Sequence, residues 1–555
     1  MKPTPYLLLV ALCACTTLWL TALPAWAQWP TSPEERLVVS SGLRSEIVSD
    51  GTGGAFVVIK ASGGGYQSSC YVQKIDQNGY LQYPVPLHLD CGYGEVVFDF
   101  HVVTDGEGGA IIGVMEDCYQ GGEWFGRLSV YHLDANGDTI YWNISSNASG
   151  RIPEQEYFVM AADSAGGAYL AYFDYGDFII QRIGSQGELL FGNDGILFNV
   201  GTAYPLPYDL TMQANLGACY ITCRGDTLRA YEFLPDGTAL WGSSGVIIPD
   251  LGYFSQMAVD GNGGFVEIYR KYMGGVNPYR LYANRIDSQG AAVWGSEGIY
   301  LAEIGWYRDI VCHYPFTYIG WTPDTSNYGP SVLQKIDYEG NLQWPEAKDI
   351  FSPNGFQGEV VIADANGTGL LFFTRQSLTG LPPYRLYVQK LDYDGPKLWP
   401  EEGVQINANQ SVYYLRLDSN GSGGGIYTWM EIDPSYGQLI CAALVNAWGE
   451  MGVVGIFPEN NPKPLPQQFI TLFPNPVNSQ SKLCLPATLS PGEYFQIRLC
   501  NVQGQVVFSM GRQHNALVVP METIWPDWPD LSSNIYWLNV QTERESWCAR
   551  FIYLK

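Results

Sequence analysis

The chain has 555 residues, of which 55 are acidic and 29 basic, so its formal net charge is −26. Hydrophobic residues make up 46% of the sequence and charged residues only 15%, which excludes a disordered acidic chain and predicts several buried cores. The scarcity of Lys and Arg argues against a nucleic-acid partner, because phosphate neutralisation needs clustered basic side chains.

The first 27 residues have the layout of a secretory signal peptide. A basic residue precedes an apolar stretch over residues 6–23, and residues 25–27 form the small-x-small pattern that signal peptidase reads. We therefore expect cleavage between Ala27 and Gln28 and an exported mature chain. A lipoprotein signal that leaves a lipid-modified Cys15 is the alternative. No later apolar run approaches the ~20 residues that a transmembrane helix needs.

A pattern of the form D-x-x-G-x-x-x-aromatic recurs at intervals of 50 to 58 residues. The aromatic residue is present in seven copies, and the last copy has Val453 at that position. Because Asp and Gly favour tight turns, each copy predicts a hairpin turn with positive φ at the glycine. The glycines are Gly79, Gly137, Gly187, Gly237, Gly290, Gly340, Gly395 and Gly449.

A second pattern, D-x-x-G-G, alternates with the first along most of the chain. Each copy lies between β-rich segments, as residues 55–60 and 110–115 illustrate, so it predicts another hairpin turn. Repeats four and six lack this pattern. Clear copies are Asp50 to Gly54, Asp105 to Gly109, Asp163 to Gly167 and Asp260 to Gly264, with looser versions at Asp364 to Gly369 and Asp418 to Gly424.

Each repeat therefore predicts four short strands, which we call a, b, c and d in chain order. A four-stranded unit of about 50 residues in eight copies predicts an all-β fold, a β-propeller. Eight blades are favoured and seven are the alternative. The repeated aromatic is expected to pack between neighbouring blades. The segment from Trp29 to Ser41 is expected to complete the last blade and to fasten the ring.

The repeats, written "DGxGG…vQkiDxxGxxxW", resemble propeller-like proteins exported by Bacteroidetes-type diderm bacteria. The resemblance covers residues 28–457, which we assign to the propeller. It implies the architecture and an exported location, and it says little about activity, because one fold hosts many functions.

Ten cysteines follow the signal peptide, and an oxidising compartment would allow them to form disulfides. Cys219 and Cys223 are four residues apart in one predicted strand, about 13 Å from one another, which is too far for a bridge. Histidines are scattered and no C-x-x-C pair occurs, so we predict no metal site.

Signatures of common enzymes are missing from the sequence: H-E-x-x-H, G-x-S-x-G, the P-loop and the EF-hand loop do not occur. The acidic turns offer one or two carboxylates each, whereas Ca²⁺ takes six or more oxygens, so no cofactor is expected and calcium is the alternative. A secreted hydrolase or lyase acting on extracellular polysaccharide is the alternative function, with Glu116, Asp117 or Asp174 as candidate acids. A quinoprotein ranks below it, because blade packing already explains the tryptophans.

Ligand recognition is predicted on the face that carries the variable loops between strands b and c. Loops on a rigid scaffold commonly carry binding residues, and Tyr and Trp offer large rigid contact areas for glycan or protein ligands. Covering of blade edges is the competing interpretation of each ring. The candidates are Tyr119, Trp124, Tyr175, Tyr272, Tyr279, Trp321, Tyr328, Tyr384 and Tyr436.

Residues 458–468 are rich in proline and predict a semi-rigid linker before a small β-sandwich over residues 469–555. This last segment contains an F-P-N-P motif, a "NVQGQVV" strand, "NIYWLNV" and a basic C-terminal strand. It resembles the C-terminal sorting domain of type IX secretion cargo, which implies handling by that machinery and a secreted or outer-surface location. Its motif residues are Asn475, Pro476, Gly504, Tyr536 and Lys555.

The sequence thus predicts an exported binding or adhesion protein without enzymatic activity, built on a propeller. A structural component of the cell envelope is a further alternative. Neither the ligand nor the disulfide pairing follows from the sequence.

Overall fold

A computed structural model of the chain describes residues 28–62, 68–89, 96–120, 123–141, 158–174, 177–198, 210–215, 218–224, 227–248, 252–274, 279–303, 308–322, 330–351, 356–377, 384–452, 471–473, 482–484, 494–500, 506–513, 518–520, 534–541 and 546–553. The chain divides into two compact units, unit 1 (Met1–Val454) and unit 2 (Gly455–Lys555). All regular elements of the described residues are β-strands, which confirms the all-β prediction. No helix in this part of the chain is long and apolar enough to cross a membrane.

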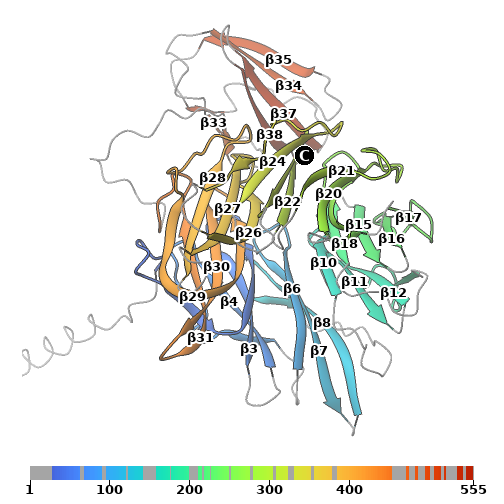
Figure 1. The fold of residues 1–555 in the computed structure, drawn as a ribbon, viewed down its shortest axis with the longest axis vertical. Helices are drawn as coiled ribbons and strands as arrows, with labels where there is room; N and C mark the ends of the chain where they lie inside the picture. Colours follow the sequence, from blue (N-terminus) through green and yellow to red (C-terminus); the bar gives the residue numbers. More distant parts are fainter. Residues whose placement is uncertain are drawn as a thin grey trace, which may run out of the picture. The chain divides into compact units, whose positions relative to one another are not determined.

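Unit 1 consists of sheets in which four strands follow one another along the chain (Figure 1). The first two groups of four are joined into one sheet by a single parallel bridge between β4 and β6. They are β2 (Arg44–Ser49), β3 (Ala55–Ser62), β4 (Ser68–Ile75) and β5 (Leu87–Leu89), then β6 (Val96–Thr104), β7 (Ala110–Gln120), β8 (Glu123–Leu133) and β9 (Thr139–Tyr141).

Four separate antiparallel sheets come next, each with four strands in chain order. The first two are β10 (Phe158–Ala162), β11 (Ala168–Asp174), β12 (Asp177–Ile183) and β13 (Ile196–Phe198), then β14 (Thr211–Asn215), β15 (Ala218–Arg224), β16 (Leu228–Phe233) and β17 (Val246–Ile247). The second two are β18 (Gly252–Val259), β19 (Phe265–Tyr272), β20 (Tyr279–Ile286) and β21 (Ile299–Glu303), then β22 (Arg308–His313), β23 (Phe316–Trp321), β24 (Val332–Asp337) and β25 (Lys348–Asp349).

The last sheet of unit 1 contains two groups that share one long strand. It comprises β26 (Phe356–Asp364), β27 (Leu370–Ser377), β28 (Tyr384–Leu391), β29 (Val404–Ser419), β30 (Gly425–Asp433), β31 (Gly437–Val445) and β1 (Leu37–Ser41). The first half of β29 pairs with β28 as a fourth strand, and its second half pairs with β30 as a first strand.

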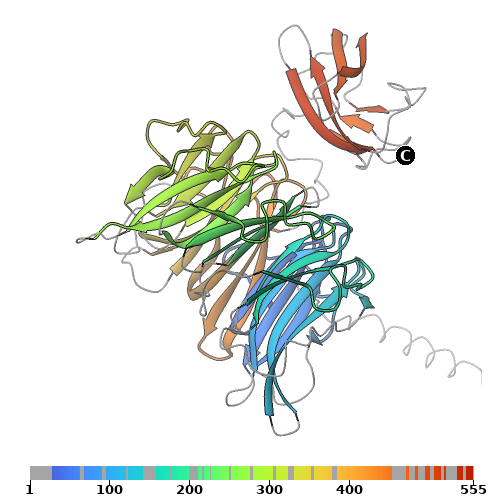
Figure 2. The same cartoon turned by 90° about the vertical axis from the view of Figure 1, so that its right-hand side faces the viewer.

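The first strands of these groups contact one another in sequence from β2 through β6, β10, β14, β18, β22 and β26 to β29, and β29 contacts β2. Figures 1 and 2 show the sheets following one another in this order, with the orange β29–β31 sheet beside the blue β3–β4 sheet. The sheets are therefore consistent with propeller-like blades, and the first strands are the innermost ones. They enclose the space that we call the channel.

The N-terminal strand joins the last sheet, as expected from the sequence. Leu37 lies opposite Ala442 in the β1–β31 pair. Arg36 adds ion pairs with Glu431 and, at 2.7 Å, with Asp433. The last sheet thus takes its outer strand from the beginning of the chain.

The glycines of the D-x-x-G turns have positive φ, as predicted, and several contact the aromatic ring of the preceding repeat. At Gly340, with φ of 93°, a Cβ atom would lie 2.7 Å from Trp294. The Trp294 indole N–H also donates a hydrogen bond of 3.1 Å to the carbonyl of Tyr338, two residues before that glycine. The same contact joins Trp241 to Ser288 and Trp399 to Ala447. The repeated aromatic therefore packs against the next sheet, which confirms its predicted role.

Trp29, which precedes the first strand of unit 1, makes the same kind of contact. Its indole N–H donates to the carbonyl of Gln77 at 3.1 Å, two residues before Gly79, and its side chain is buried. Repeat eight has Val453 where the other repeats have an aromatic ring, and residue 453 lies outside the described residues. Trp29 therefore supplies the ring that packs on the first D-x-x-G turn.

Hydrophobic cores join neighbouring groups of strands. One core combines Tyr169 and Phe178 of β11 and β12 with Ile221 and Tyr231 of β15 and β16. Cys219 and Cys223 are buried in this core as free thiols, in agreement with the prediction that they do not bridge. Among the cysteines whose side chains are described, Cys70, Cys312 and Cys441 are also free.

Unit 2 contains a three-stranded and a four-stranded antiparallel sheet. The smaller sheet is β32 (Thr471–Phe473), β33 (Lys482–Cys484) and β36 (Val518–Pro520), and the larger is β35 (Val506–Gln513), β34 (Tyr494–Cys500), β37 (Asn534–Gln541) and β38 (Ser546–Tyr553). Ile497 and Leu538 of the larger sheet are buried. Tyr536 of the predicted sorting motif lies in β37 opposite Phe551.

Candidate functional site

The aromatic residues predicted for ligand binding lie at or beside the ends of strands b and c. Tyr272 ends β19 and Tyr279 begins β20, with the b–c loop between them. Their rings meet edge to face with centroids 5.4 Å apart, and the guanidinium of Arg270 lies 5.1 Å from the Tyr279 centroid. Tyr436 lies between β30 and β31 and is 74% exposed. Tyr272 and Tyr436 are exposed and Tyr279 is half-buried at the end of unit 1 that carries the b–c loops, which we call the loop end.

Two other predicted rings offer little surface to a ligand. Trp321, the last residue of β23, is buried in a core with Leu281 and Ile319. Tyr384, the first residue of β28, is buried in another core. Both rings therefore pack in the interior of unit 1, where they are not accessible to a ligand. Tyr119 and Trp124 oppose one another in the β7–β8 pair, but their side chains lie outside the described part, as do Tyr175 and Tyr328.

A second set of side chains, which we call the channel cluster, lies on the innermost strands. Glu46, His101, Gln256 and Arg416 belong to β2, β6, β18 and β29, and each lies opposite the fourth residue of the strand that follows. They therefore occupy the same level in four different groups of strands. Arg44, Asp99, Asp309 and Glu359, on β2, β6, β22 and β26, complete the cluster.

Ion pairs connect the members of the cluster on β2 and β6. The His101 Nδ1 atom lies 3.2 Å from Glu46 Oε2, and its Nε2 atom lies 3.3 Å from Asp99 Oδ2. Arg44 Nη2 lies 2.6 Å from Asp99 Oδ1 and 3.4 Å from Glu46 Oε1. Burial opposes the charged imidazole, but the two carboxylates outweigh it and raise the pKa of His101 to about 10. His101 is therefore a cation at neutral pH.

The opposite part of the cluster is less well neutralised. Burial raises the pKa of Asp309 to about 6, although its carboxylate accepts hydrogen bonds from the backbone N–H groups of Ile310 and Ile362 at 2.9 and 2.8 Å. Burial also raises the pKa of Glu359, against the nearby charge of Arg416. Arg416 itself donates to the carbonyl of Leu415 at 2.9 Å and acts on these carboxylates through its charge.

Irregular pairing marks the innermost strands beside this cluster. The register shifts between Val97 and Asp99, between Tyr253 and Gln256, between Gln357 and Val360, and between Tyr413 and Arg416. Such β-bulges re-aim side chains and are frequent next to binding sites. All four lie toward the beginning of a first strand, which is the loop end. The loop end of the channel is thus the part of unit 1 where the repeat geometry is broken.

Tyr414 lies inside one of these bulges and has a φ of 55°. A left-handed conformation is strained for a residue with a Cβ atom. Its side chain is nevertheless 48% exposed, although β29 is an innermost strand. The bulge therefore exposes an aromatic ring on an innermost strand, two residues before Arg416.

The opposite end of the channel, the turn end, also contains a hollow, of about 420 Å³. Its acidic groups already accept hydrogen bonds from the protein. Asp50 Oδ1 accepts from the N–H groups of Thr52 and Gly54 at 2.8 and 2.9 Å, and Asp418 Oδ2 accepts from the N–H of Ser49 at 2.7 Å. The D-x-x-G turns behave in the same way, as Asp76 shows with Asn78 at 2.8 Å. These side chains form the turns, as turn chemistry predicts.

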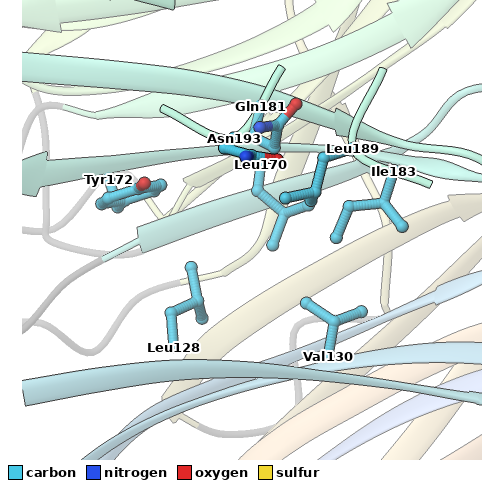
Figure 3. Close-up of a pocket in the computed structure, with 8 residues that line it drawn as sticks. All are labelled: Leu128, Val130, Leu170, Tyr172, Gln181, Ile183, Leu189 and Asn193. Carbon is cyan, nitrogen blue, oxygen red and sulfur yellow. The ribbon is translucent and has the colours of Figure 1, made fainter. Parts of the chain in front are cut away.

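A small apolar gap lies between the second and third groups of strands (Figure 3). Leu128 and Val130 of β8 point toward Leu170 of β11 and its neighbours across the gap. Its volume of about 20 Å³ holds at most about one water molecule. We regard it as a packing gap between sheets rather than a ligand site.

The acids proposed for a hydrolase do not form a described pair. Glu116 is buried on β7 with Arg127 Nη2 at 3.1 Å, whereas the side chains of Asp117 and Asp174 lie outside the described part. Within the described residues no group of three or more His, Cys, Asp or Glu side chains could hold a metal ion. Of the remaining predicted positions, Ala27, Asn475, Pro476, Gly504 and Lys555 lie outside the described residues.

Our sequence interpretation missed the channel cluster. The sequence pattern that could have revealed it is a pair of polar side chains at alternate positions of a strand, because a strand buried on both faces would be apolar throughout. Arg44 with Glu46 and Asp99 with His101 show this pattern. The bulges of β26 and β29 shift this alternation, so Glu359 and Arg416 do not show it.

Comparisons with known proteins identify the C-terminal segment. Residues 471–554 match the model of the secretion system C-terminal sorting domain. None of the curated proteins compared with the chain matches it.

Several solved structures are similar to the chain at low identity. PorZ, a surface component of the type IX secretion system of Porphyromonas gingivalis, is 10% identical with a TM-score of 0.32 over 92% of this chain and 70% of that chain. The BP39L lectin of Burkholderia pseudomallei is 13% identical with a TM-score of 0.42 over 66% of this chain and 99% of that chain. A Dyadobacter fermentans protein of unknown function is 8% identical with a TM-score of 0.34 over 76% and 98%.

The sorting domain confirms the predicted resemblance and the predicted destination. Residues 471–554 are a type IX secretion sorting domain, and the protein is exported to the cell surface or the surroundings of a Bacteroidetes-type bacterium.

Proposed function

We propose that the protein is an exported recognition protein in which unit 1, an eight-bladed propeller, binds an extracellular glycan or protein at the loop end of its channel. Unit 2, which we interpret as a small β-sandwich, delivers it through the type IX machinery. The binding itself requires no cofactor. The circuit of first-strand contacts from β2 to β29 and back supports the count of eight blades.

The observation that carries the binding proposal is the gathering of charged side chains from different groups of strands at the loop end of the channel. At the loop end, the charged and amide side chains of the channel cluster gather on strands from six groups, where apolar residues would stabilise the fold better. Polar groups retained at such a cost are typical of binding sites. The exposed Tyr272, which contacts the half-buried Tyr279, and the exposed Tyr436 lie at the same end.

A binding screen tests this proposal. The full chain is applied to an array of glycans and extracellular proteins, in parallel with a Tyr272→Ala/Tyr279→Ala variant. The control variant is Leu197→Ala, because Leu197 is exposed on the outer strand β13. We expect wild type and control to bind the same ligand and the tyrosine variant to bind it at least about tenfold more weakly.

Binding by a folded chain that is equal in all three proteins would contradict the loop-end location. Absence of binding by folded wild type would contradict the recognition function. In that case the screen turns to cleavage of extracellular polysaccharides, which would favour the hydrolase or lyase alternative.

A further inference from the structure

The environment of Tyr414 carries an inference that rests on the proposed function and specifies its ligand. Tyr414 combines three properties that rarely occur together: an innermost strand, an exposed aromatic ring and a left-handed backbone. Each is unfavourable for stability or neutral to it, since glycine would remove the strain at φ of 55° and an exposed ring gains little burial. Observed strain of this kind points to function.

The neighbouring strand holds this strained segment in place. The carboxylate of Glu359, in the bulge of β26, accepts a hydrogen bond from the N–H of Leu415, the residue after Tyr414. Arg375 of β27 stacks against the ring of Tyr413 at 5.8 Å and donates to the carbonyl of Val412 at 3.4 Å. The conformation of Tyr414 is therefore imposed by contacts between β26, β27 and β29, so the ring is preorganised.

The polar groups around the ring offer both donors and acceptors. Arg416, two residues away, presents a half-buried guanidinium that donates a hydrogen bond to the carbonyl of its neighbour Leu415. Glu359 and Asp309 present carboxylates within range of its charge. A guanidinium donates to hydroxyl oxygens and a carboxylate accepts from hydroxyl hydrogens. An aromatic face beside such a pair suits a ring that carries several hydroxyl groups.

The charges also indicate which kind of sugar fits. The carboxylates of Glu46, Asp99, Asp309 and Glu359 face the cations of Arg44, His101 and Arg416, so the channel cluster offers no excess of positive charge to an acidic sugar. We propose that the loop end of the channel binds a neutral sugar unit, stacked on Tyr414 and hydrogen-bonded to Arg416 and Glu359.

Two substitutions of Tyr414 separate this role from a structural one. Tyr414→Gly removes the ring and relieves the left-handed strain, so the melting temperature should stay the same or rise. Tyr414→Phe keeps the ring. Wild type, both variants and the control Leu197→Ala, whose side chain is exposed on the outer strand β13, are titrated as full chains with cellobiose, maltose and lactose, and with uronic-acid oligosaccharides of similar length.

We expect wild type, Tyr414→Phe and Leu197→Ala to bind at least one neutral disaccharide, and Tyr414→Gly to bind it at least about tenfold more weakly at an unchanged or higher melting temperature. Equal binding by Tyr414→Gly would overturn the site, and preference for the acidic oligosaccharides would overturn the sugar class. If none of these sugars binds, but a ligand from the array binds wild type and not the Tyr272→Ala/Tyr279→Ala variant, this inference is wrong and the recognition function stands. If folded wild type binds no ligand of either screen, both are wrong.

Discussion

The polar side chains at the turn end of unit 1 have different kinds of partners from those at the loop end. At the turn end, Asp50 and Asp76 bond their own backbone, and glycines at fixed positions adopt positive φ. At the loop end, charges such as Glu46 and His101 pair across sheets, and Tyr414 adopts positive φ without being a glycine. At the turn end, the repeated sequence forms the same type of hydrogen-bonded turn in many groups of strands. Function can then vary where the repeats differ.

The largest effect on this comparison is expected from Trp29→Ala, which breaks the turn end at the junction between the last and first sheets. Loss of the buried indole and of its hydrogen bond to Gln77 should lower the free energy of unfolding by about 4 kcal/mol. Urea unfolding of the full chain, followed by circular dichroism, measures it. The control Tyr436→Ala should change stability by less than about 0.5 kcal/mol, because its side chain is exposed. Similar values for both variants would contradict the closing role of Trp29.

A smaller effect separates backbone strain from packing between sheets at the turn end. Gly340→Ala and Gly367→Ala both place a Cβ atom at positive φ, of 93° and 79°. The new methyl group meets Trp294 at 2.7 Å in the first variant and no atom within 4 Å in the second. We expect destabilisation by about 3 kcal/mol for Gly340→Ala and about 1 kcal/mol for Gly367→Ala. Equal losses of melting temperature would mean that the aromatic contact adds nothing.

The smallest effect, taken over one pH unit, concerns the pH dependence of stability at the loop end. Because the pKa of His101 is raised from its ordinary value of 6.5 to about 10, its stabilising contribution is complete below pH 6.5 and is lost as pH rises toward 10. The free energy of unfolding of wild type should therefore fall with pH more steeply than that of His101→Gln, by up to about 1.4 kcal/mol per pH unit. Unfolding curves at pH 6, 8 and 9.5 test this. Parallel pH profiles would show that His101 is not a buried cation.

The repeats made the turn end predictable from sequence. A glycine that recurs at a fixed spacing predicts a position with positive φ in each repeat. A large aromatic ring that recurs four residues later predicts an equivalent buried position in each repeat. Both expectations hold at Gly340 and Trp294. The pairing of β1 with β31 was predictable for the same reason, since residues 29–41 resemble the segment after each d strand.

The loop end was less predictable because its geometry depends on contacts distant in sequence. Trp321 and Tyr384 flank variable loops, but their strands extend far enough to bury both rings between sheets. Arg416 and Glu359 reach the channel through bulges, and a single sequence does not reveal where a strand gains an extra residue. The strain at Tyr414 is equally invisible, because no residue type in its neighbourhood requires it.

The pairing of β1 with β31 also affects how unit 1 reaches its folded state. Arg36 and Glu431 are separated by 395 residues, so the contact that completes the last sheet has one of the largest loop-closure requirements in the molecule. Contacts of this separation slow folding. Until β1 arrives, β31 keeps an exposed edge with unpaired backbone groups, which is where sheets of different molecules associate. The N-terminal strand β1 is synthesised first, but we expect it to pair with β31 last. This pairing covers the exposed edge of β31 and so removes a site at which unit 1 could aggregate.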